Sequence, residues 1–131
     1  MPKHYKPTPN WENRKRKSDD DVLLEATVFS DKLIQAESTL IHWLKRKEQG
    51  TVSVDGKNIT CWYCGGTWFH YTLNVNFMSL YIHSSGEDAF DSLAYCANEI
   101  AEILYKNHPD TTIRWTEHPH RRQYLKETMG S

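Results

Sequence analysis

Two cysteines near the middle of the chain have the spacing of half a zinc site. Cys61 and Cys64 are separated by two residues and precede Gly65-Gly66, and glycines at this point let backbone amides approach the sulfur atoms. A tetrahedral zinc ion needs two further ligands. The candidates for them are Cys96, His70, His83, His118 and His120. The competing interpretation treats both cysteines as small apolar residues of a strand, and on it we predict no metal and no cofactor.

Two histidines share a second pattern, in which a hydroxyl side chain follows two positions later. The tripeptides are His70-Tyr71-Thr72 and His83-Ser84-Ser85. We expect the two tripeptides to lie on neighbouring strands. These six residues resemble the paired motifs of the two-histidine phosphoesterases, and the resemblance implies a small hydrolase in which each histidine donates or accepts a proton at a phosphate held by the hydroxyl. The alternative is that they are ordinary polar positions of alternating strands, and on this interpretation we predict no catalytic residue.

Basic side chains gather at the front of the chain and at two later points. Residues 1–17 contain six basic residues, one acidic residue and three prolines, a composition typical of a segment that touches something anionic or large. We predict that the basic clusters together form one partner-binding surface opposite an acidic second helix. Its residues are Lys3, Lys6, Arg14, Lys15, Arg16, Lys17, Lys45, Arg46, Lys47, Arg114, Arg121 and Arg122. The alternative is that the front of the chain is a solvated tail and that Lys45, Arg46 and Lys47 only complement the C-terminal end of a helix.

Length and composition limit the class of protein. The chain has 131 residues and a net charge of −1, with five Trp, seven Tyr and four Phe to build one core, which favours a single domain. Three cysteines argue against a disulfide framework. No apolar run approaches the ~18 residues of a membrane span, and the basic, proline-rich start does not match a secretory signal. We therefore expect a cytoplasmic protein that does not enter a membrane.

Hydrophobic spacing predicts a long first helix over residues 18–48. Ser18 is a good helix start, and one apolar stripe with spacings of four and three follows it. The stripe consists of Val22, Ala26, Phe29, Leu33, Ala36, Leu40 and Trp43. Residues 22–29 are also β-prone, so a shorter helix over residues 31–48, begun at Ser30-Asp31, is the alternative.

The remaining pattern predicts strands followed by a second helix. Residues 51–54 and 58–63 flank Asp55-Gly56, a strong hairpin signal, and two alternating stretches over residues 68–73 and 77–83 follow. Ser84 with Glu87 forms a capping box for a helix over residues 86–107, whose apolar stripe consists of Phe90, Leu93, Ala94, Ala97, Ile100, Ala101 and Leu104. A last strand follows at 111–115. The predicted fold is α+β, with an antiparallel sheet of three to four strands and two helices packed on one face, in the order α-β-β-β-(β)-α-β. Its predicted parts are a flexible basic arm (1–17), one domain (18–117) and a tail (118–131).

This predicted layout resembles two known classes. Its helix, three strands and helix are similar to the double-stranded RNA-binding domain, but the lysine positions of that family correspond here to Glu87, Asp88 and Asp91, which would repel phosphate. The layout is also similar to small phage-encoded inhibitors of bacterial defence, including a type II-A anti-CRISPR protein with a basic arm ahead of a helix-strands-helix-strand body. The second resemblance rests on element order and charge, and it implies an inhibitor.

The sequence therefore favours a non-enzymatic binding protein, an inhibitor or regulator of a nucleic-acid-handling protein complex. The acidic second helix would cover a basic cleft of the partner, and the basic arm would enter an anionic groove. Direct binding of RNA or DNA is the first alternative, and a small zinc-binding protein or phosphoesterase is the second. Both a monomer and a dimer are compatible with the pattern.

Overall fold

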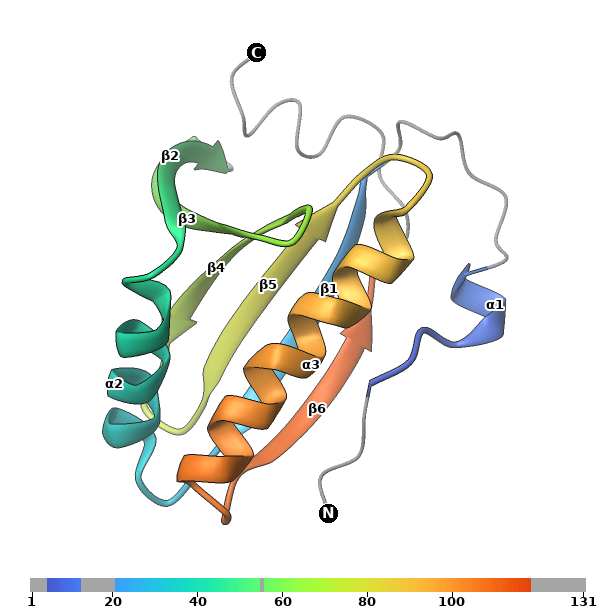
Figure 1. The fold of residues 1–131 in the computed structure, drawn as a ribbon. Helices are drawn as coiled ribbons and strands as arrows, with labels where there is room; N and C mark the ends of the chain where they lie inside the picture. The colour runs from blue at the N-terminus through green and yellow to red at the C-terminus, as the bar shows by residue number, and fades with distance from the viewer. Residues whose placement is uncertain (1–4, 13–20, 55, 119–131) are drawn as a thin grey trace.

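The computed structural model describes residues 5–12, 21–54 and 56–118. Within them, six strands form one antiparallel sheet in the order β2-β3-β4-β5-β1-β6, accompanied by three helices (Figure 1). The elements in chain order are α1 (Pro9–Glu12), β1 (Val22–Phe29), α2 (Leu33–Leu44), β2 (Glu48–Val54), β3 (Lys57–Cys64), β4 (Thr67–Leu73), β5 (Met78–Ser84), α3 (Ala89–Asn107) and β6 (Thr112–Glu117).

The predicted sheet of three to four strands with two helices is wrong, and the main error lies in the first element. Residues 22–29, expected to be helical, form β1, which lies between β5 and β6. Its alternate residues Val22, Leu24, Ala26 and Val28 are fully buried. Six of its eight residues are apolar, so the stretch also matches a helical spacing, and pairing with a strand on each side decides the outcome. Both resemblances in layout begin with a helix, and the structure has a strand at that position.

The hairpin signal is confirmed. Val54 pairs with Lys57, which leaves a two-residue connection at Asp55-Gly56, and Gly56 has a φ of 77°. The other predicted strands are present as β2 to β6, most of them longer than expected. The predicted capping box is wrong, because Ser84 belongs to β5 and its hydroxyl donates to the Gly66 carbonyl at 3.0 Å instead. α3 begins at Ala89.

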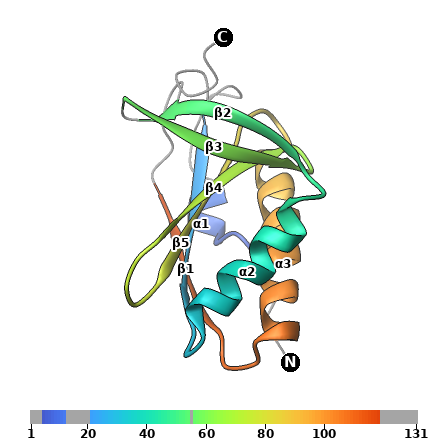
Figure 2. The same ribbon diagram turned by 90° about the vertical axis from the view of Figure 1, so that its left-hand side faces the viewer.

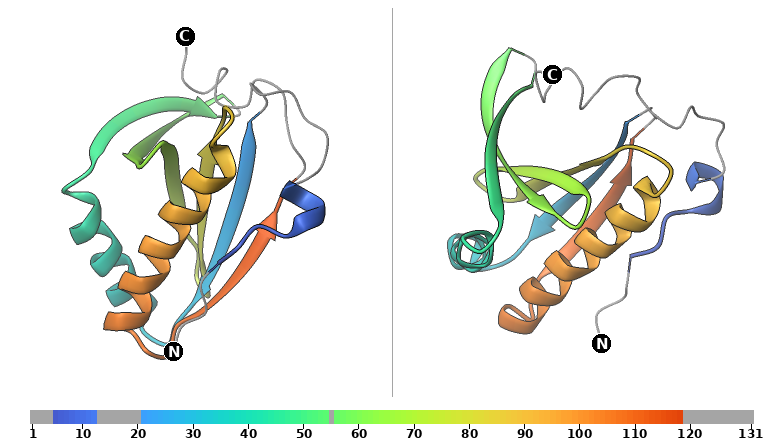
Figure 3. Two further views of the ribbon diagram at one scale, coloured as in Figure 1. Left: turned by 45° about the vertical axis from the view of Figure 1, so that its right-hand side comes forward. Right: turned by 45° about the horizontal axis from the view of Figure 1, so that its top comes forward.

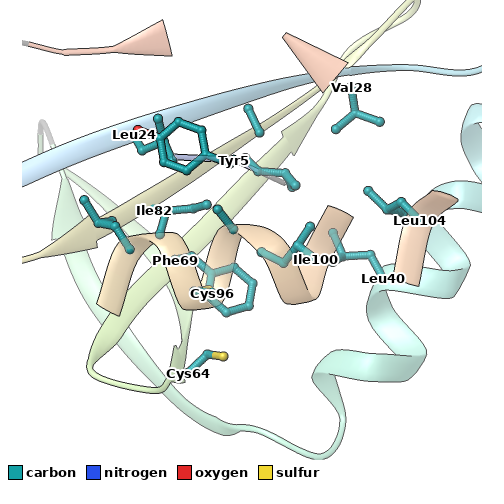
Figure 4. Packing of buried hydrophobic residues seen from close by; sticks show 14 of the residues in the cluster. Tyr5, Leu24, Val28, Leu40, Cys64, Phe69, Ile82, Cys96, Ile100 and Leu104 are labelled. Atoms are coloured by element: carbon teal, nitrogen blue, oxygen red, sulfur yellow. The ribbon is translucent and has the colours of Figure 1, made fainter. Parts of the chain in front are cut away.

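Both long helices cover the same face of the sheet. Figure 2 shows α2 and α3 on one side of the strands, and it shows the β2–β3 hairpin bending away from the line of the other strands. The predicted apolar stripe of α3 is buried against the sheet, and Phe69, Ile82, Ile100 and Leu104 lie together between the layers (Figure 4). Two turns at one end are joined because Asp110 accepts hydrogen bonds from Ser30 Oγ (3.1 Å) and from the Asp31 amide (2.7 Å).

Residues 5–12, part of the predicted flexible arm, are docked on the domain. Tyr5 and Trp11 are buried, and their rings contact Trp115 of β6 and Phe90 of α3 at centroid distances of 4.9 and 5.1 Å. Figure 3 shows α1 beside β6 and the start of α3. The rest of the predicted arm and residues 119–131 of the predicted tail lie outside the described residues. Among the described helices, none has the length and apolar character needed to cross a membrane.

Candidate functional site

The face of the sheet turned away from α2 and α3, here called the open face, carries the histidines that the sequence singled out. Side chains alternate between the two faces of a strand, and Phe69, Leu80 and Ile82 take part in the core beneath the helices. Strand register then places the alternate residues on the open face. They include Leu23, Glu25, Thr27, Trp68, His70, Thr72, Ser79, Tyr81, His83, Arg114 and Thr116.

His70 and His83 lie against each other on β4 and β5. Their rings are nearly parallel, with centroids 5.1 Å apart, and His70 Nδ1 lies 3.3 Å from His83 Nε2. His70 also stacks on Tyr81, and its Nδ1 is 3.9 Å from the Cys61 sulfur atom. Both histidines are almost completely buried, with 4% and 2% of their surface exposed. The adjacency that the sequence predicted is therefore present.

Burial makes both histidines weak bases. It lowers the pKa of His70 to about 4. For His83, burial is again the main cause, with the neighbouring His70 and His118 adding to it, and the pKa falls to about 3. At neutral pH both rings are uncharged, so one nitrogen can donate to the other.

This geometry differs from that of a two-histidine phosphoesterase. The resemblance implies two histidines that both act at a phosphate, whereas here His70 Nδ1 and His83 Nε2 are 3.3 Å apart and leave no room for a phosphate between them. The hydroxyl of Ser84, next to His83, is on the opposite face and donates to a backbone carbonyl. The paired histidines can fix the register of β4 against β5. Because they are buried, they also make the stability of the sheet depend on pH.

The paired cysteines of the sequence do not form a unit. Cys61 belongs to a small cluster on the open side with Val52, Ile59 and Trp68, while Cys64 belongs to the main core with Cys96. An odd spacing along a strand sends the two thiols to opposite faces, so one metal ion cannot join them. Within the described part of the chain, no three Cys, His, Asp or Glu side chains are arranged to hold a metal ion.

Cys64 has a different partner from the one expected. A hydrogen bond from Cys96 lowers the pKa of Cys64 and raises that of Cys96 well above its usual value. The Cys64 thiol also lies 3.4 Å from Glu99 Oε2, which Lys47 Nζ approaches to 3.9 Å. For Cys61, burial alone raises the pKa to about 11. The raised pKa values of Cys61 and Cys96 describe protonated, structural thiols.

The described members of the predicted basic surface do not come together. Lys45, Arg46 and Lys47 follow α2 and lead into β2, one edge strand, whereas Arg114 lies on β6, the other edge strand, on the open face. The Arg114 guanidinium packs 5.5 Å from the Phe29 ring centroid, and Lys6 is exposed on the docked segment. The predicted partner-binding residues outside the described ranges are Lys3, Arg14, Lys15, Arg16, Lys17, Arg121 and Arg122.

The described part of the chain is acidic. It carries thirteen acidic and eight basic side chains, which gives a net charge of −5 with neutral histidines, against −1 for the whole chain. Glu87, Asp88 and Asp91 are all exposed where α3 begins. No ion pair within the described residues involves any of the three. Among the described residues, this end of α3 is therefore a negatively charged surface with no ion-pair partner.

Sequence reasoning missed the contacts that hold the docked segment and the end of β6. Glu117 accepts hydrogen bonds from the Tyr5 hydroxyl (2.7 Å), the Thr8 amide (2.9 Å) and the Thr8 hydroxyl (2.6 Å). His118 Nε2 lies 2.9 Å from Glu25 Oε1 on the open side. Each contact joins residues about a hundred positions apart, and no local pattern in the sequence marks such pairs.

A groove between α2 and α3 is the concave feature that the two helices form. Its lining residues are Ser38, Thr39, His42, Trp43, Arg46, Glu102, Ile103, Lys106 and Asn107. Only Arg46 of these was predicted to bind a partner. The groove has a volume of about 660 Å³, within the range of ligand-binding sites.

Comparison of the chain with protein-family models, with curated proteins and with solved structures finds no match. The function must therefore be argued from the surfaces and sites of this chain itself.

Proposed function

We propose that the protein is a binding protein that inhibits or regulates a nucleic-acid-handling protein, and that α3 is its main contact. The observation that carries this proposal is the exposed acidic start of α3, formed by Glu87, Asp88 and Asp91. Proteins that handle nucleic acid bind phosphate with clefts rich in Lys and Arg. An acidic helix is complementary to such a cleft, and charge complementarity both steers the encounter and selects the partner.

The charge of the described residues favours a protein partner over nucleic acid. A body with a net charge of −5 repels a phosphate backbone. The same charge attracts a basic cleft. Direct nucleic-acid binding would have to rely on the basic residues outside the described ranges.

The test compares two variants with the same change in net charge. Glu87→Lys with Asp91→Lys reverses the acidic surface, and Asp31→Lys with Glu48→Lys reverses two exposed carboxylates elsewhere. Tagged full-length protein is used to capture partners from host lysate treated with nuclease, and affinities are then measured with the purified partner. We expect the first variant to bind roughly tenfold or more weakly and the second to bind like the wild type.

Two results would contradict the proposal. One is a protein partner that binds both double variants equally well. The other is recovery of nothing except nuclease-sensitive RNA or DNA, with an affinity that falls steeply as salt is added, which is the behaviour of direct phosphate binding. In both cases circular dichroism of each variant establishes that the fold is retained.

The basic segment 14–17 provides a second contact in this proposal. Replacing Arg14, Lys15, Arg16 and Lys17 by Glu should weaken partner binding while the melting temperature stays unchanged, because none of these residues belongs to the described core. Titration of the partner with this variant beside the wild type measures the effect. Unchanged affinity would remove the segment from the interface.

A further inference from the structure

The groove between α2 and α3 combines an apolar floor with cationic rims. α2 and α3 run in opposite directions along it, because Lys47 approaches Glu99 at one end and Thr39 Oγ1 lies 2.7 Å from His108 Nε2 at the other. Trp43 and Ile103 are half-buried between them. The Trp43 ring is held in place from two sides, by Phe69 of the core at 5.8 Å and by Lys47 Nζ at 4.9 Å from the ring centroid.

Two basic side chains line the rims of the groove. Arg46, which follows α2, and Lys106 on α3 are both exposed. Within the described residues neither makes an ion pair, and Glu102 is the only carboxylate among the lining residues. The groove is therefore locally cationic, although the described residues together carry a net charge of −5.

The shape of the groove favours an extended ligand. The lining positions run from Ser38 on α2 to Arg46 just beyond its end, a length of about 12 Å at 1.5 Å per residue, which matches three or four residues of an extended peptide. Hydroxyl and amide groups of Ser38 and Asn107 also line it, and such groups can pair with a peptide backbone.

We propose that this groove binds an acidic peptide segment that carries one large apolar side chain. The apolar side chain packs on Trp43 and Ile103, and carboxylates on either side of it pair with Arg46 and Lys106. The site is separate from the acidic start of α3, so it does not depend on the function proposed above. A partner that uses both would offer a basic cleft to one end of α3 and an acidic segment to the groove.

The probe is a phage-displayed library of random peptides, selected against the full-length protein. We expect enriched sequences to combine at least one aromatic or large aliphatic residue with two or more Asp or Glu. A fluorescein-labelled peptide of the most enriched sequence is then titrated by fluorescence polarisation. Its affinity should fall with increasing salt, because carboxylate pairs on an exposed groove are screened.

Matched variants locate the binding. Arg46→Gln with Lys106→Gln removes the two rim charges, and Lys32→Gln with Lys57→Gln removes two exposed lysines elsewhere. The first pair should weaken peptide binding by roughly tenfold or more, and the second should change it by less than about threefold. Ile103→Ser tests the floor and should weaken binding without affecting the salt dependence.

Three results would overturn the proposal. The library gives no enriched sequence, the enriched sequences lack acidic residues, or the peptide binds the Arg46→Gln, Lys106→Gln variant as tightly as it binds the wild type. Because both substituted side chains are exposed, circular dichroism should show an intact fold in every case, so loss of binding cannot be attributed to unfolding. Binding lost with Glu87→Lys and Asp91→Lys instead would assign the peptide to the acidic surface and also overturn the assignment to the groove.

Discussion

The two faces of the sheet are buried in different ways. Phe69 and His70 are neighbours on β4, yet Phe69 packs under α2 and α3 while His70 faces the open side. The covered face is filled by apolar side chains from the sheet and both helices. On the open face, buried polar groups pair with each other, as His70 does with His83, and stack on aromatic rings such as Tyr81. The covered face should therefore set the overall stability, and the open face should set how that stability depends on pH.

Phe69→Ala is expected to produce the largest effect. The ring is fully buried and contacts both Trp43 and Trp62, so its removal loses transfer free energy and leaves a cavity, at a cost of about 3–5 kcal/mol in the free energy of unfolding. Urea denaturation at pH 7.5 measures it. Thr72→Ala, an exposed change on the open face of the same strand, is the control and should stay within about 0.5 kcal/mol. Similar effects from both changes would remove the contrast between the faces.

The sequence predicts the fold best where a pattern is local. The Asp55-Gly56 hairpin, the strands on either side of it and the apolar stripe of α3 all depend on residues close together, and all are present. The first helix fails because Val22 to Phe29 is apolar on nearly every residue. Such a run satisfies both periodicities, and only the pairing with β5 and β6, which lie far away in the sequence, selects a strand.

For the candidate sites, sequence reasoning found residue types but not their neighbours. It placed His70 near His83 because both lie on consecutive strands, and this is confirmed. It paired Cys61 with Cys64 by spacing alone, although three positions along a strand reverse the face. The groove could not be predicted from the sequence, because Arg46 follows α2 and Lys106 belongs to α3, and these helices meet only in the folded protein.

The second largest effect is expected from acid, which should destabilise the protein through His70 and His83 on the open face. The pKa values of His70 and His83 are about 4 and about 3 in the folded protein, against 6.5 for an ordinary histidine. Between pH 6.5 and pH 4 the unfolded chain binds protons that the folded protein does not, so stability is full above pH 6.5 and falls as the pH is lowered. Each histidine contributes up to about 1.4 kcal/mol per pH unit. Urea denaturation at pH 7.5, 6 and 5 measures the slope.

Matched substitutions assign this slope to the pair. His70→Asn keeps a polar atom near the position of Nδ1, and His83→Gln keeps one near Nε2, so the contact between the two side chains can persist without a titrating ring. The double variant should lose most of the pH dependence between pH 7.5 and pH 5. His42→Gln changes an exposed histidine of α2 and should retain the wild-type slope. A wild-type protein equally stable at pH 7.5 and pH 5 would show that the open face does not control the response to acid.

The smallest effect is expected at the docked segment, which extends the covered face beyond β6. Glu117→Ala removes the acceptor of three hydrogen bonds from Tyr5 and Thr8. Hydrogen bonds to a carboxylate are stronger than neutral ones, but these lie at the surface, so we expect a loss of about 1–2 kcal/mol. Burial, and then Glu117, raises the pKa of Tyr5 above its usual range, so the phenol remains a donor at any pH used for the measurement.

Cleavage by chymotrypsin, which cuts after aromatic residues, distinguishes release of the segment from general loss of stability. In Glu117→Ala, cleavage after Tyr5 and Trp11 should become faster while the core is still resistant, because local opening exposes only these two rings. Glu12→Ala, a change at an exposed carboxylate of the same segment, should leave the cleavage rate close to that of the wild type. Unchanged cleavage in Glu117→Ala would mean that the segment is held without the carboxylate, by the packing of Trp11 on Phe90 and by the hydrogen bonds that join Tyr5 to Asn98 and Trp11 to the His118 carbonyl. The covered face would then be extended by ring packing together with hydrogen bonds between neutral groups, and the contribution of the Glu117 carboxylate would be small.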